Sequence, residues 1–549
     1  MTRRDVVEVA AVALVVAAIH VLFRLSAGFL VGALNDDGVY VVLGKAIAQG
    51  EGYRSIHLVA APVHVRYPPG LPLLLAIPWA LGGSLGAVRA TIAVVNVAAT
   101  ALAAALVWWL GRRRLALPRW PLAACAIAPF VLDGTIQYYN IPLSEPYLVL
   151  GWVAALVLAY PLFDPAASGW RPLVRAMVVG LVLATTALFR TAGIVLLPAV
   201  LLALALHRRW SAALATAAAA AVPLLAWRLV QAAAIARGPV SSVPDDLGYW
   251  QWLGVDGPIA LAGYAGHTLI ANTIEYVPKL ASYMFPSLAI GVGIVILGCV
   301  GVAFACLELR RSHTALVLTT LAASGLTLLW PFAQGRLLLP LLPFLGLLAA
   351  VTLARVAGRL PARVAAIGVP ALLGVMALAV TRRQVALREA AARAYVTGAV
   401  RLEDQSPAMT LAFRSRFIAH VTAWVQARAT PGDRIMVDAP AAVYLYTGRQ
   451  AVAGQPTESR LAATVFGVPG RYLAERIVAD SVTVVVWAPP AAALERDLAA
   501  IAAGCPHVLA RELSPLAAFF RVTRDETCLR QRILQAPAAS PARAHRSPA

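Results

Sequence analysis

The sequence predicts a polytopic α-helical membrane protein with about eleven transmembrane helices and a C-terminal extracytoplasmic α/β domain. Of its 549 residues, 60% are hydrophobic and only 13% are charged, which is too apolar for a soluble protein that must cover its surface with polar groups. Apolar runs long enough to cross a bilayer recur from Val6 to about Val380. After Arg382 charges return and the apolar runs shorten, as is typical of a soluble domain.

The arginines predict the orientation of these spans. A net charge of +20 suggests a nucleic-acid partner, but the arginines lie between apolar runs rather than on one patch, so we expect no nucleic acid. Cytoplasmic loops are enriched in Lys and Arg, and an odd number of spans then places the chain after Arg382 outside. Arg382 and Arg383 weakly oppose this. The arginines that fall on every second connection are Arg3 and Arg4, then Arg112, Arg113, Arg114 and Arg119, then Arg171 and Arg175, then Arg208 and Arg209, then Arg310 and Arg311, and then Arg355, Arg359 and Arg363.

The hydropathy pattern divides residues 1–383, the predicted transmembrane domain, into spans and two long outer loops, 32–69 and 237–279. Arg24 lies near the outer end of the first span and is expected to reach the interface. The segment Leu71–Leu81 is apolar but too short to span, so it predicts a helix at the interface or partly buried in protein. The expected spans are about 6–30, 87–110, 121–132, 146–162, 173–189, 194–206, 212–232, 288–307, 315–330, 337–353 and 364–380.

Residues 384–549 form the predicted extracytoplasmic domain. Apolar spacing from Met409 to Val425 predicts a helix, and AAALERDLAAIAAG predicts an amphipathic helix that ends at glycine. Strands are predicted in RIMVDAP, SVTVVVWAP and AAFFRVT. Cys505 and Cys528 both lie in this domain, where a disulfide can persist, but the sequence leaves their pairing open.

The strongest candidate for chemistry is the acidic pair Asp36 and Asp37, just past the first span. Crowded like charges and partial desolvation can raise the proton affinity of one carboxylate toward that of a useful base. Tyr40 follows Asp36 by one helical turn and could order the site. The alternative is a purely structural role at a helix N-terminus, where aspartate is favoured by the macrodipole and by free N–H groups.

Five segments in the apolar region resemble, in order, the GT-C glycosyltransferases, and most closely the branch of protein O-mannosyltransferases and lipid A aminoarabinose transferases. YLYTGR at 444–449 is similar to the extracytoplasmic domains of bacterial relatives. The five segments are DDGVY at 36–40, YPPGLP at 67–72, LSEPY at 143–147, LFRTAGIVLLPA at 188–199 and QGRLLLPLLPF at 334–344.

This resemblance implies an enzyme of the bacterial cytoplasmic membrane. It would transfer a sugar from a polyprenyl-phosphate donor to a hydroxyl of an envelope lipid, glycan or protein on the outer face, usually with inversion. Asp36 matches the acidic residue of the family's first loop and would deprotonate the acceptor, while Asp37 stands where the family often has Glu and would have a supporting or metal-linked role. Where the aminoarabinose transferases have Glu-Lys before the paired prolines, this chain has Arg66 and Tyr67. The resemblance therefore does not imply their metal site or their donor.

An inverting displacement also needs cations where the phosphate leaves. Arg336 is the first candidate, Arg190 in the tight turn 190–193 the second and Arg66 the third. For each, the alternative is ordinary interfacial anchoring.

Other polar residues have open roles. Glu145 could position the acceptor or the base, or could cap its helix. Tyr249, within LGYWQWLG, could stack on a sugar or belong to an interfacial aromatic belt. His57 and His64 are candidates for a divalent metal together with Asp36 or Glu145, without a compact ligand motif. Three residues are expected to serve folding or acceptor docking, because they lie far along the chain from the acidic loop: Tyr444, Tyr446 and Arg449.

Two other classes of protein compete with the transferase. A secondary transporter usually has ionisable residues near mid-membrane and two related halves, whereas the acids of this chain fall in outer loops and no clear repeat is present. A noncatalytic assembly or sensor protein would leave the acids of the first loop unexplained. The sugar, the acceptor and the length of the carrier cannot be inferred from the sequence.

Overall fold

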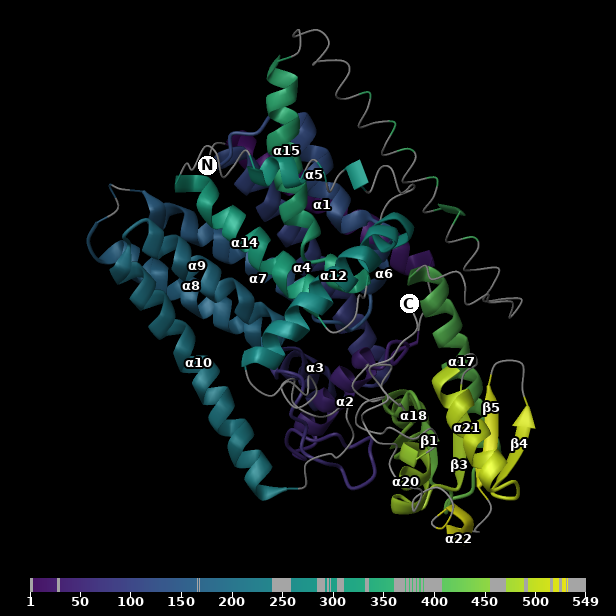
Figure 1. The fold of residues 1–549 in the computed structure, drawn as a ribbon. Coiled ribbons are helices and arrows are strands. Elements are labelled where there is room, and N and C mark those ends of the chain that lie inside the picture. The colour runs from purple at the N-terminus through teal and green to yellow at the C-terminus, as the bar shows by residue number, and fades with distance from the viewer. Residues whose placement is uncertain are drawn as a thin grey trace.

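We describe the protein from a computed structural model. It describes residues 3–26, 30–164, 166, 168–238, 258–283, 292, 293, 296, 298–303, 311–330, 335–359, 371, 375, 378, 382, 385, 386, 389, 407–454, 471–487, 492–513, 517–522, 526–529 and 531. A helical block makes up most of the molecule, and a C-terminal region built around a β-sheet lies beside one end of it (Figure 1).

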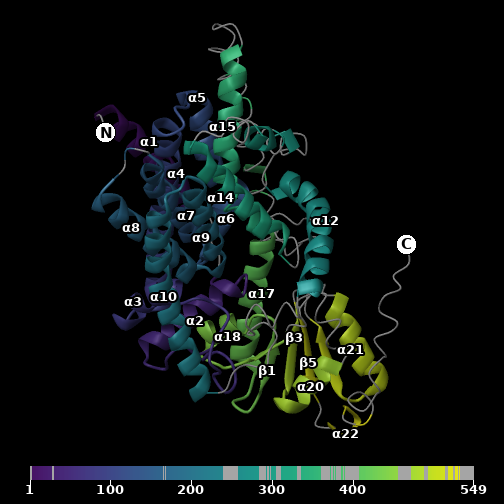
Figure 2. The same cartoon turned by 60° about the vertical axis from the view of Figure 1, so that its left-hand side comes forward.

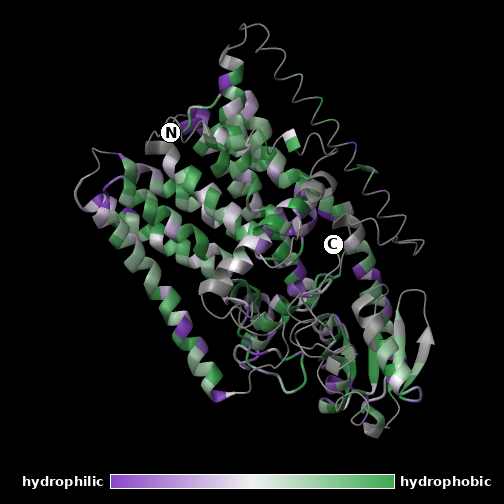
Figure 3. Ribbon diagram, in the orientation of Figure 1, coloured by the Kyte–Doolittle hydropathy of each residue, from purple (hydrophilic) through white to green (hydrophobic). Residues whose placement is uncertain are grey.

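Five helices among the described residues are long and apolar enough to cross a membrane, which makes the chain a multi-pass membrane protein. Their surfaces are largely hydrophobic (Figure 3). The five helices are α1 (Arg3–Ser26), α4 (Leu85–Arg113), α7 (Glu145–Ala159) continued by η1 (Tyr160–Phe163), α8 (Trp170–Phe189) and α10 (Trp210–Arg237).

Shorter apolar helices complete the block. The expected short helix at 71–81 is confirmed as α3 (Gly70–Ala80). Two expected spans, 288–307 and 364–380, lie mostly outside the described residues, so the count of eleven stays a prediction. The remaining helices are α5 (Arg119–Val131), α6 (Asp133–Tyr138), η2 (Thr191–Val195), α9 (Leu196–Leu206), α14 (Arg311–Leu328), η4 (Gly335–Leu338) and α15 (Leu342–Arg359).

The second predicted outer loop is helical over its second half. Residues 258–283 form α12 (Pro258–Tyr283), which lies along one side of the block (Figure 2). Asn272 fixes it there, because its side-chain amide donates to the carbonyl oxygens of Leu328 at 2.8 Å and of Trp330 at 2.6 Å. The polar residues that interrupt the apolar pattern of this helix in the sequence thus bond to the end of α14.

The N-terminus and the acidic turn lie at opposite ends of the block (Figure 1). At one end Glu8 of α1 pairs with Arg119 at 2.7 Å and with Arg112 at 3.7 Å, so the N-terminus and the arginine cluster after α4 lie together. The opposite end carries α2 (Asp36–Ala48), which packs on α3. Gly44 allows this approach, since a Cβ there would lie 2.9 Å from the Cβ of Leu75.

The C-terminal region contains a mixed five-stranded sheet in the order β2-β1-β3-β5-β4. The three predicted strands and two predicted helices are present, and the disulfide between Cys505 and Cys528 is formed. Strand β4 was not predicted, because LAREL places two adjacent charges where alternation is expected. The elements are α17 (Pro407–Arg428), β1 (Ile435–Val437), α18 (Pro440–Thr447), β2 (Val452–Ala453), α20 (Arg471–Ala479), β3 (Val484–Trp487), α21 (Ala492–Gly504), β4 (Leu509–Leu513), β5 (Ala518–Val522) and α22 (Glu526–Leu529).

Helix α18 joins this region to α2, and the two helices lie side by side in both views (Figures 1 and 2). The contact is close because glycine and alanine meet there: a Cβ on Gly38 would lie 3.0 Å from that of Ala441. A parallel β-bridge between Leu58 and Ala451 adds a second connection to the first outer loop. The predicted domain boundary at residue 383 falls in a stretch of which the structure describes only single residues.

Candidate active site

The turn between α1 and α2 sets the position of the acidic pair. Gly32 has φ +95° and Asn35 has φ +65°, so the chain reverses tightly before α2 begins at Asp36. The carboxylate of Asp37 accepts the amide N–H of Gly32 at 2.6 Å and that of Leu34 at 2.9 Å. Asp37 therefore holds the turn together from inside. Burial raises the pKa of its carboxyl to about 6, although the hydrogen bonds from the backbone oppose this rise.

Asp36 instead faces two side chains from distant segments. The hydroxyl of Tyr67 donates to Oδ1 at 2.6 Å, and the guanidinium of Arg336 donates to Oδ2 at 2.5 Å. Burial favours the protonated acid, but the charge of Arg336 and the hydrogen bond from Tyr67 outweigh it and hold the pKa of Asp36 below its usual value. Of the two carboxylates, Asp37 has the raised proton affinity and Asp36 has the contacts of a site residue.

His64 positions Tyr67. Its Nε2 accepts the amide N–H of Tyr67 at 3.0 Å, its Nδ1 bonds to the hydroxyl of Ser55 at 3.1 Å, and its ring stacks on that of Tyr67 with centroids 5.1 Å apart. Burial lowers the pKa of His64 to about 3, so the ring is neutral. Both ring nitrogens are thus used within the protein.

These contacts do not fit the suggested metal site. The imidazole of His57 is buried beside the β-bridge, where its own carbonyl oxygen accepts the amide N–H of Ala451 at 2.9 Å. Among the residues that the structure describes, no group of three His, Cys, Asp or Glu side chains is placed to hold a metal ion.

A second buried ion pair adjoins Asp36. Glu145, the first residue of α7, is fully buried, and its Oε1 lies 3.0 Å from Nη1 of Arg190, which follows the last residue of α8. Arg190 also donates to the hydroxyl of Ser144 at 3.1 Å, and that hydroxyl lies 3.2 Å from the hydroxyl of Tyr40. The ring of Tyr40 in turn lies 4.8 Å from that of Tyr67, which connects the two pairs into one network.

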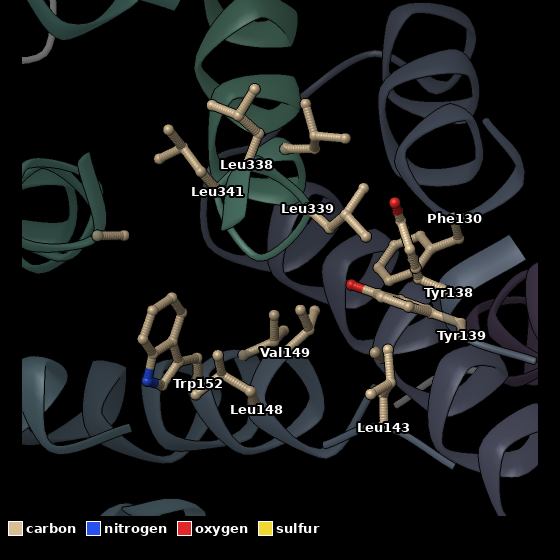
Figure 4. Close-up of a cluster of buried hydrophobic side chains, with 14 of the residues drawn as sticks. Phe130, Tyr138, Tyr139, Leu143, Leu148, Val149, Trp152, Leu338, Leu339 and Leu341 are labelled. Carbon is tan, nitrogen blue, oxygen red and sulfur yellow. The ribbon is translucent and has the colours of Figure 1, made fainter. Parts of the chain in front are cut away.

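Apolar packing holds Arg336 in this network. The leucines that follow it pack against α7, α5 and the α6–α7 connection (Figure 4). The negative charge of Glu145 reinforces that of Asp36 in raising the pKa of Arg336 further, so the guanidinium stays charged. The side chains of this cluster include Leu338, Leu339, Leu341, Phe130, Tyr138, Tyr139, Leu143, Leu148, Val149 and Trp152.

The structure brings most of the predicted site residues together. The network consists of Asp36, Tyr40, Tyr67, Glu145, Arg190 and Arg336. Asp37 stabilises the turn from which α2 begins. Arg66 contributes a more distant positive charge that helps to lower the pKa of Asp36. Tyr249 and the segment LGYWQWLG lie outside the described residues.

Three contributors from the C-terminal region were not expected at the acidic turn. The hydroxyl of Tyr446 accepts the amide N–H of Val31 at 3.0 Å, and Arg414 donates to the carbonyl oxygen of Ala33 at 3.0 Å while pairing with Asp438. Tyr446 is expected from the sequence to serve folding or acceptor docking, and its bond to Val31 places it at the acidic turn although the two residues are far apart along the chain. Ser144 could have been noticed from its place in LSEPY beside Glu145.

The chain is structurally similar to the GT-C glycosyltransferases, as its motifs suggest. Within that class the fold is similar to that of ArnT from Cupriavidus metallidurans in the apo state, with a TM-score of 0.54 at 16% identity over 95% of this chain and 98% of that one.

Other structures give the same result. ArnT from Cupriavidus metallidurans bound to undecaprenyl phosphate gives a TM-score of 0.51 with the same identity and coverage. AglB, the archaeal oligosaccharyltransferase from Archaeoglobus fulgidus, in complex with an inhibitory peptide and a dolichol-phosphate, gives 0.53 at 15% identity over 89% of this chain and 70% of that one. No protein-family model and no curated protein matches the sequence.

Proposed function

We propose that this protein is a glycosyltransferase that moves a sugar from a polyprenyl-phosphate donor to an acceptor hydroxyl, with Asp36 as the base. One observation carries the proposal: the carboxylate of Asp36 and the guanidinium of Arg336 meet at 2.5 Å, beside the buried pair of Glu145 and Arg190. The site thus offers a proton acceptor next to two cations, which is what an inverting displacement at a sugar phosphate requires.

The chemistry follows from these groups. The acceptor oxygen attacks the anomeric carbon of the sugar as the bond from that carbon to the phosphate oxygen breaks. The proton of the acceptor hydroxyl passes to Asp36, and the electron pair of the broken bond remains on the polyprenyl phosphate. Arg336 stabilises the charge that develops on that phosphate, and Arg190 adds a second positive charge.

Arg336 links donor binding to the strength of the base. Without a donor it bonds to Asp36 and keeps the pKa of that carboxyl low. A donor phosphate competes for the same guanidinium, and as Arg336 turns toward it the pKa of Asp36 rises. Asp36 therefore becomes a stronger base once the donor is in place.

The location proposed for the site is the outer face of a bacterial cytoplasmic membrane. The network lies at the end of the block opposite the pairs that join Glu8 to Arg112 and Arg119. Arginine-rich connections favour the cytoplasm, which leaves Asp36 and the C-terminal region outside. The disulfide between Cys505 and Cys528 supports this side, since disulfides persist in oxidising compartments. The acceptor would then be an envelope lipid, glycan or protein.

The test uses purified protein, a panel of polyprenyl-phosphate sugars and mass spectrometry of the candidate acceptors. Asp36→Asn should lower transfer by on the order of 10²–10⁴-fold, the usual contribution of a general base, while the protein stays folded. Glu51→Gln is the matched control, because Glu51 is an exposed carboxylate on the same loop. Transfer at the normal rate by Asp36→Asn would exclude Asp36 as the base. Flux of a substrate into proteoliposomes without a glycosylated product would favour a transporter instead.

A further inference from the structure

A pocket lies near the acidic turn. It has a volume of about 330 Å³ and opens between the end of α1, the start of α4 and the turn that precedes α2. Val31 of that turn and Val41 of α2 form part of its wall. Val41 lies about 140° around the helix from Asp36, so α2 stands between this pocket and the candidate active site.

Two arginines face this pocket, Arg24 from the last turn of α1 and Arg89 from the beginning of α4. They are close enough for each positive charge to act on the other. Arg24 donates from Nε to the side-chain oxygen of Asn140 and from Nη2 to its carbonyl oxygen, both at 2.6 Å. In the described part of the chain no carboxylate pairs with either arginine.

A buried polar chain holds Arg24 in place. Asn140 and His20 are both fully buried, and the side-chain amide of Asn140 donates to Nδ1 of His20 at 2.9 Å. Nε2 of His20 then donates to the carbonyl oxygen of Phe130 at 2.8 Å. These partners are neutral, so they fix the guanidinium without cancelling its charge. Arg24, which is expected to reach the interface from the outer end of the first span, is thus also bonded within the protein.

The rest of the surroundings is apolar. Val31, Val41, Val88 and Ile92 line the pocket and are apolar side chains. Beyond it, the faces of α1 and α4 expose further apolar side chains, including Leu22 at 65%, Leu25 at 81% and Val94 at 69%. Such exposed apolar surface on a membrane helix contacts lipid tails. Two cations that no carboxylate of the described residues pairs with therefore lie at the end of an apolar surface suited to lipid chains.

We propose that this pocket binds the phosphate group of a membrane lipid, separately from the donor site. Arg24 and Arg89 bind the phosphate oxygens, as arginine does elsewhere through paired N–H groups, and the valine and isoleucine side chains contact the first carbons of the lipid. A free phosphate offers the same charge without the carbon chain. The apolar walls favour the lipid.

The experiment measures lipid retention by native mass spectrometry of the full chain in detergent. Dioleoyl phosphatidic acid is the probe, and dioleoyl phosphatidylcholine, whose phosphate is masked by a choline, is the comparison lipid. Arg89→Gln and Arg24→Gln should each lower the affinity for phosphatidic acid roughly tenfold or more. Arg228→Gln is the matched control, since Arg228 lies on α10 and bonds to Gln231 rather than lining the pocket.

Three outcomes would overturn the proposal. The first is retention of phosphatidic acid by Arg89→Gln and Arg24→Gln equal to that of Arg228→Gln. The second is equal retention of phosphatidylcholine and phosphatidic acid by the unmodified protein. The third is displacement of phosphatidic acid by an equal concentration of inorganic phosphate, which would make the occupant a free phosphate. Arg89 is exposed, so Arg89→Gln decides the question even where Arg24→Gln unfolds.

Discussion

Arg336 donates a hydrogen bond from Nη2 to Oδ2 of Asp36 at 2.5 Å, although the two residues are 300 positions apart. This pair joins the first loop to the segment before α15. It places the candidate base in contact with the arginine that is the candidate for binding the donor phosphate. The site therefore contains its own counterion, and its electrostatics depend on whether Arg336 faces Asp36 or a donor.

Replacement of Arg336 should change the pH dependence of activity. Its charge holds the pKa of Asp36 below the usual value, so in Arg336→Gln that pKa rises. The acid limb of the pH–activity profile should then move to higher pH, and transfer at neutral pH should fall at least about tenfold. Arg336→Lys keeps the charge and should keep the limb near its original position.

Tyr67→Phe removes a hydrogen bond that lowers the pKa of Asp36 less than the charge of Arg336 does. The acid limb of the pH–activity profile should therefore move to higher pH by a smaller amount than in Arg336→Gln. Arg54→Gln serves as the control, since Arg54 lies on the same loop but donates to the carbonyl oxygen of Ala61. An acid limb that stays in place in folded Arg336→Gln would contradict the assignment of Asp36.

Asp37→Asn should change how stability depends on pH. The carboxyl of Asp37 has a pKa of about 6 in the folded protein, above its ordinary value of 3.8. Its contribution to stability is therefore complete below pH 3.8 and is lost as the pH rises through about 6, amounting to roughly 3 kcal/mol. Asp37→Asn should lack this decline when the free energy of unfolding is measured between pH 4 and 7.

Asp36→Asn is the matched comparison for that experiment. The pKa of Asp36 is lowered in the folded protein, so its contribution is present above pH 3.8 and is lost as the pH falls below it. Asp36→Asn should keep the decline in a smaller form, because loss of the Asp36 charge removes one of the influences that raise the pKa of Asp37. Identical pH dependence in Asp37→Asn and the unmodified protein would show that Asp37 does not titrate in this range.

Tyr446→Phe tests whether the C-terminal region holds the acidic turn. The change removes the acceptor for the amide N–H of Val31, which should lower the free energy of unfolding by about 1 kcal/mol. Transfer should fall while the acid limb stays in place, because Asp36 keeps Tyr67 and Arg336. Tyr444→Phe is the control: its ring lies 4.7 Å from the ammonium of Lys45, a contact that the substitution preserves. Equal rates of transfer by Tyr446→Phe and Tyr444→Phe would show that the hydroxyl of Tyr446 has no role in holding the acidic turn.

Loss of the disulfide should destabilise the C-terminal region without removing it from the turn. Cys505 and Cys528 close a loop with a sequence separation of 23, for which chain entropy predicts a contribution of about 3 kcal/mol. Cys505→Ser with Cys528→Ser should lower the unfolding temperature of the purified protein. In intact cells, protection of both thiols from a membrane-impermeant maleimide until reduction would support the outward orientation. Free thiols at Cys505 and Cys528 in the native protein would contradict the bond.

The sequence by itself determined the membrane class, the long spans and the C-terminal alternation of helices and strands. These follow from hydropathy and periodicity, which depend on neighbours within one segment. It also indicated Asp36, Glu145, Arg190 and Arg336, since charged residues beside apolar spans need a reason to be there. The helix at 258–283 and strand β4 were not predicted, because their polar residues break the local hydrophobic pattern.

Only the tertiary structure decided which contacts each carboxylate makes. Asp36 and Asp37 are adjacent and chemically identical, yet α2 points one toward Arg336 and Tyr67 and the other toward the amides of its own turn. It also brought Tyr446 to Val31 and set Arg24 beside Arg89. Such contacts arise from the packing of whole helices, where the identity of a residue's partner depends on distant segments that no local pattern encodes.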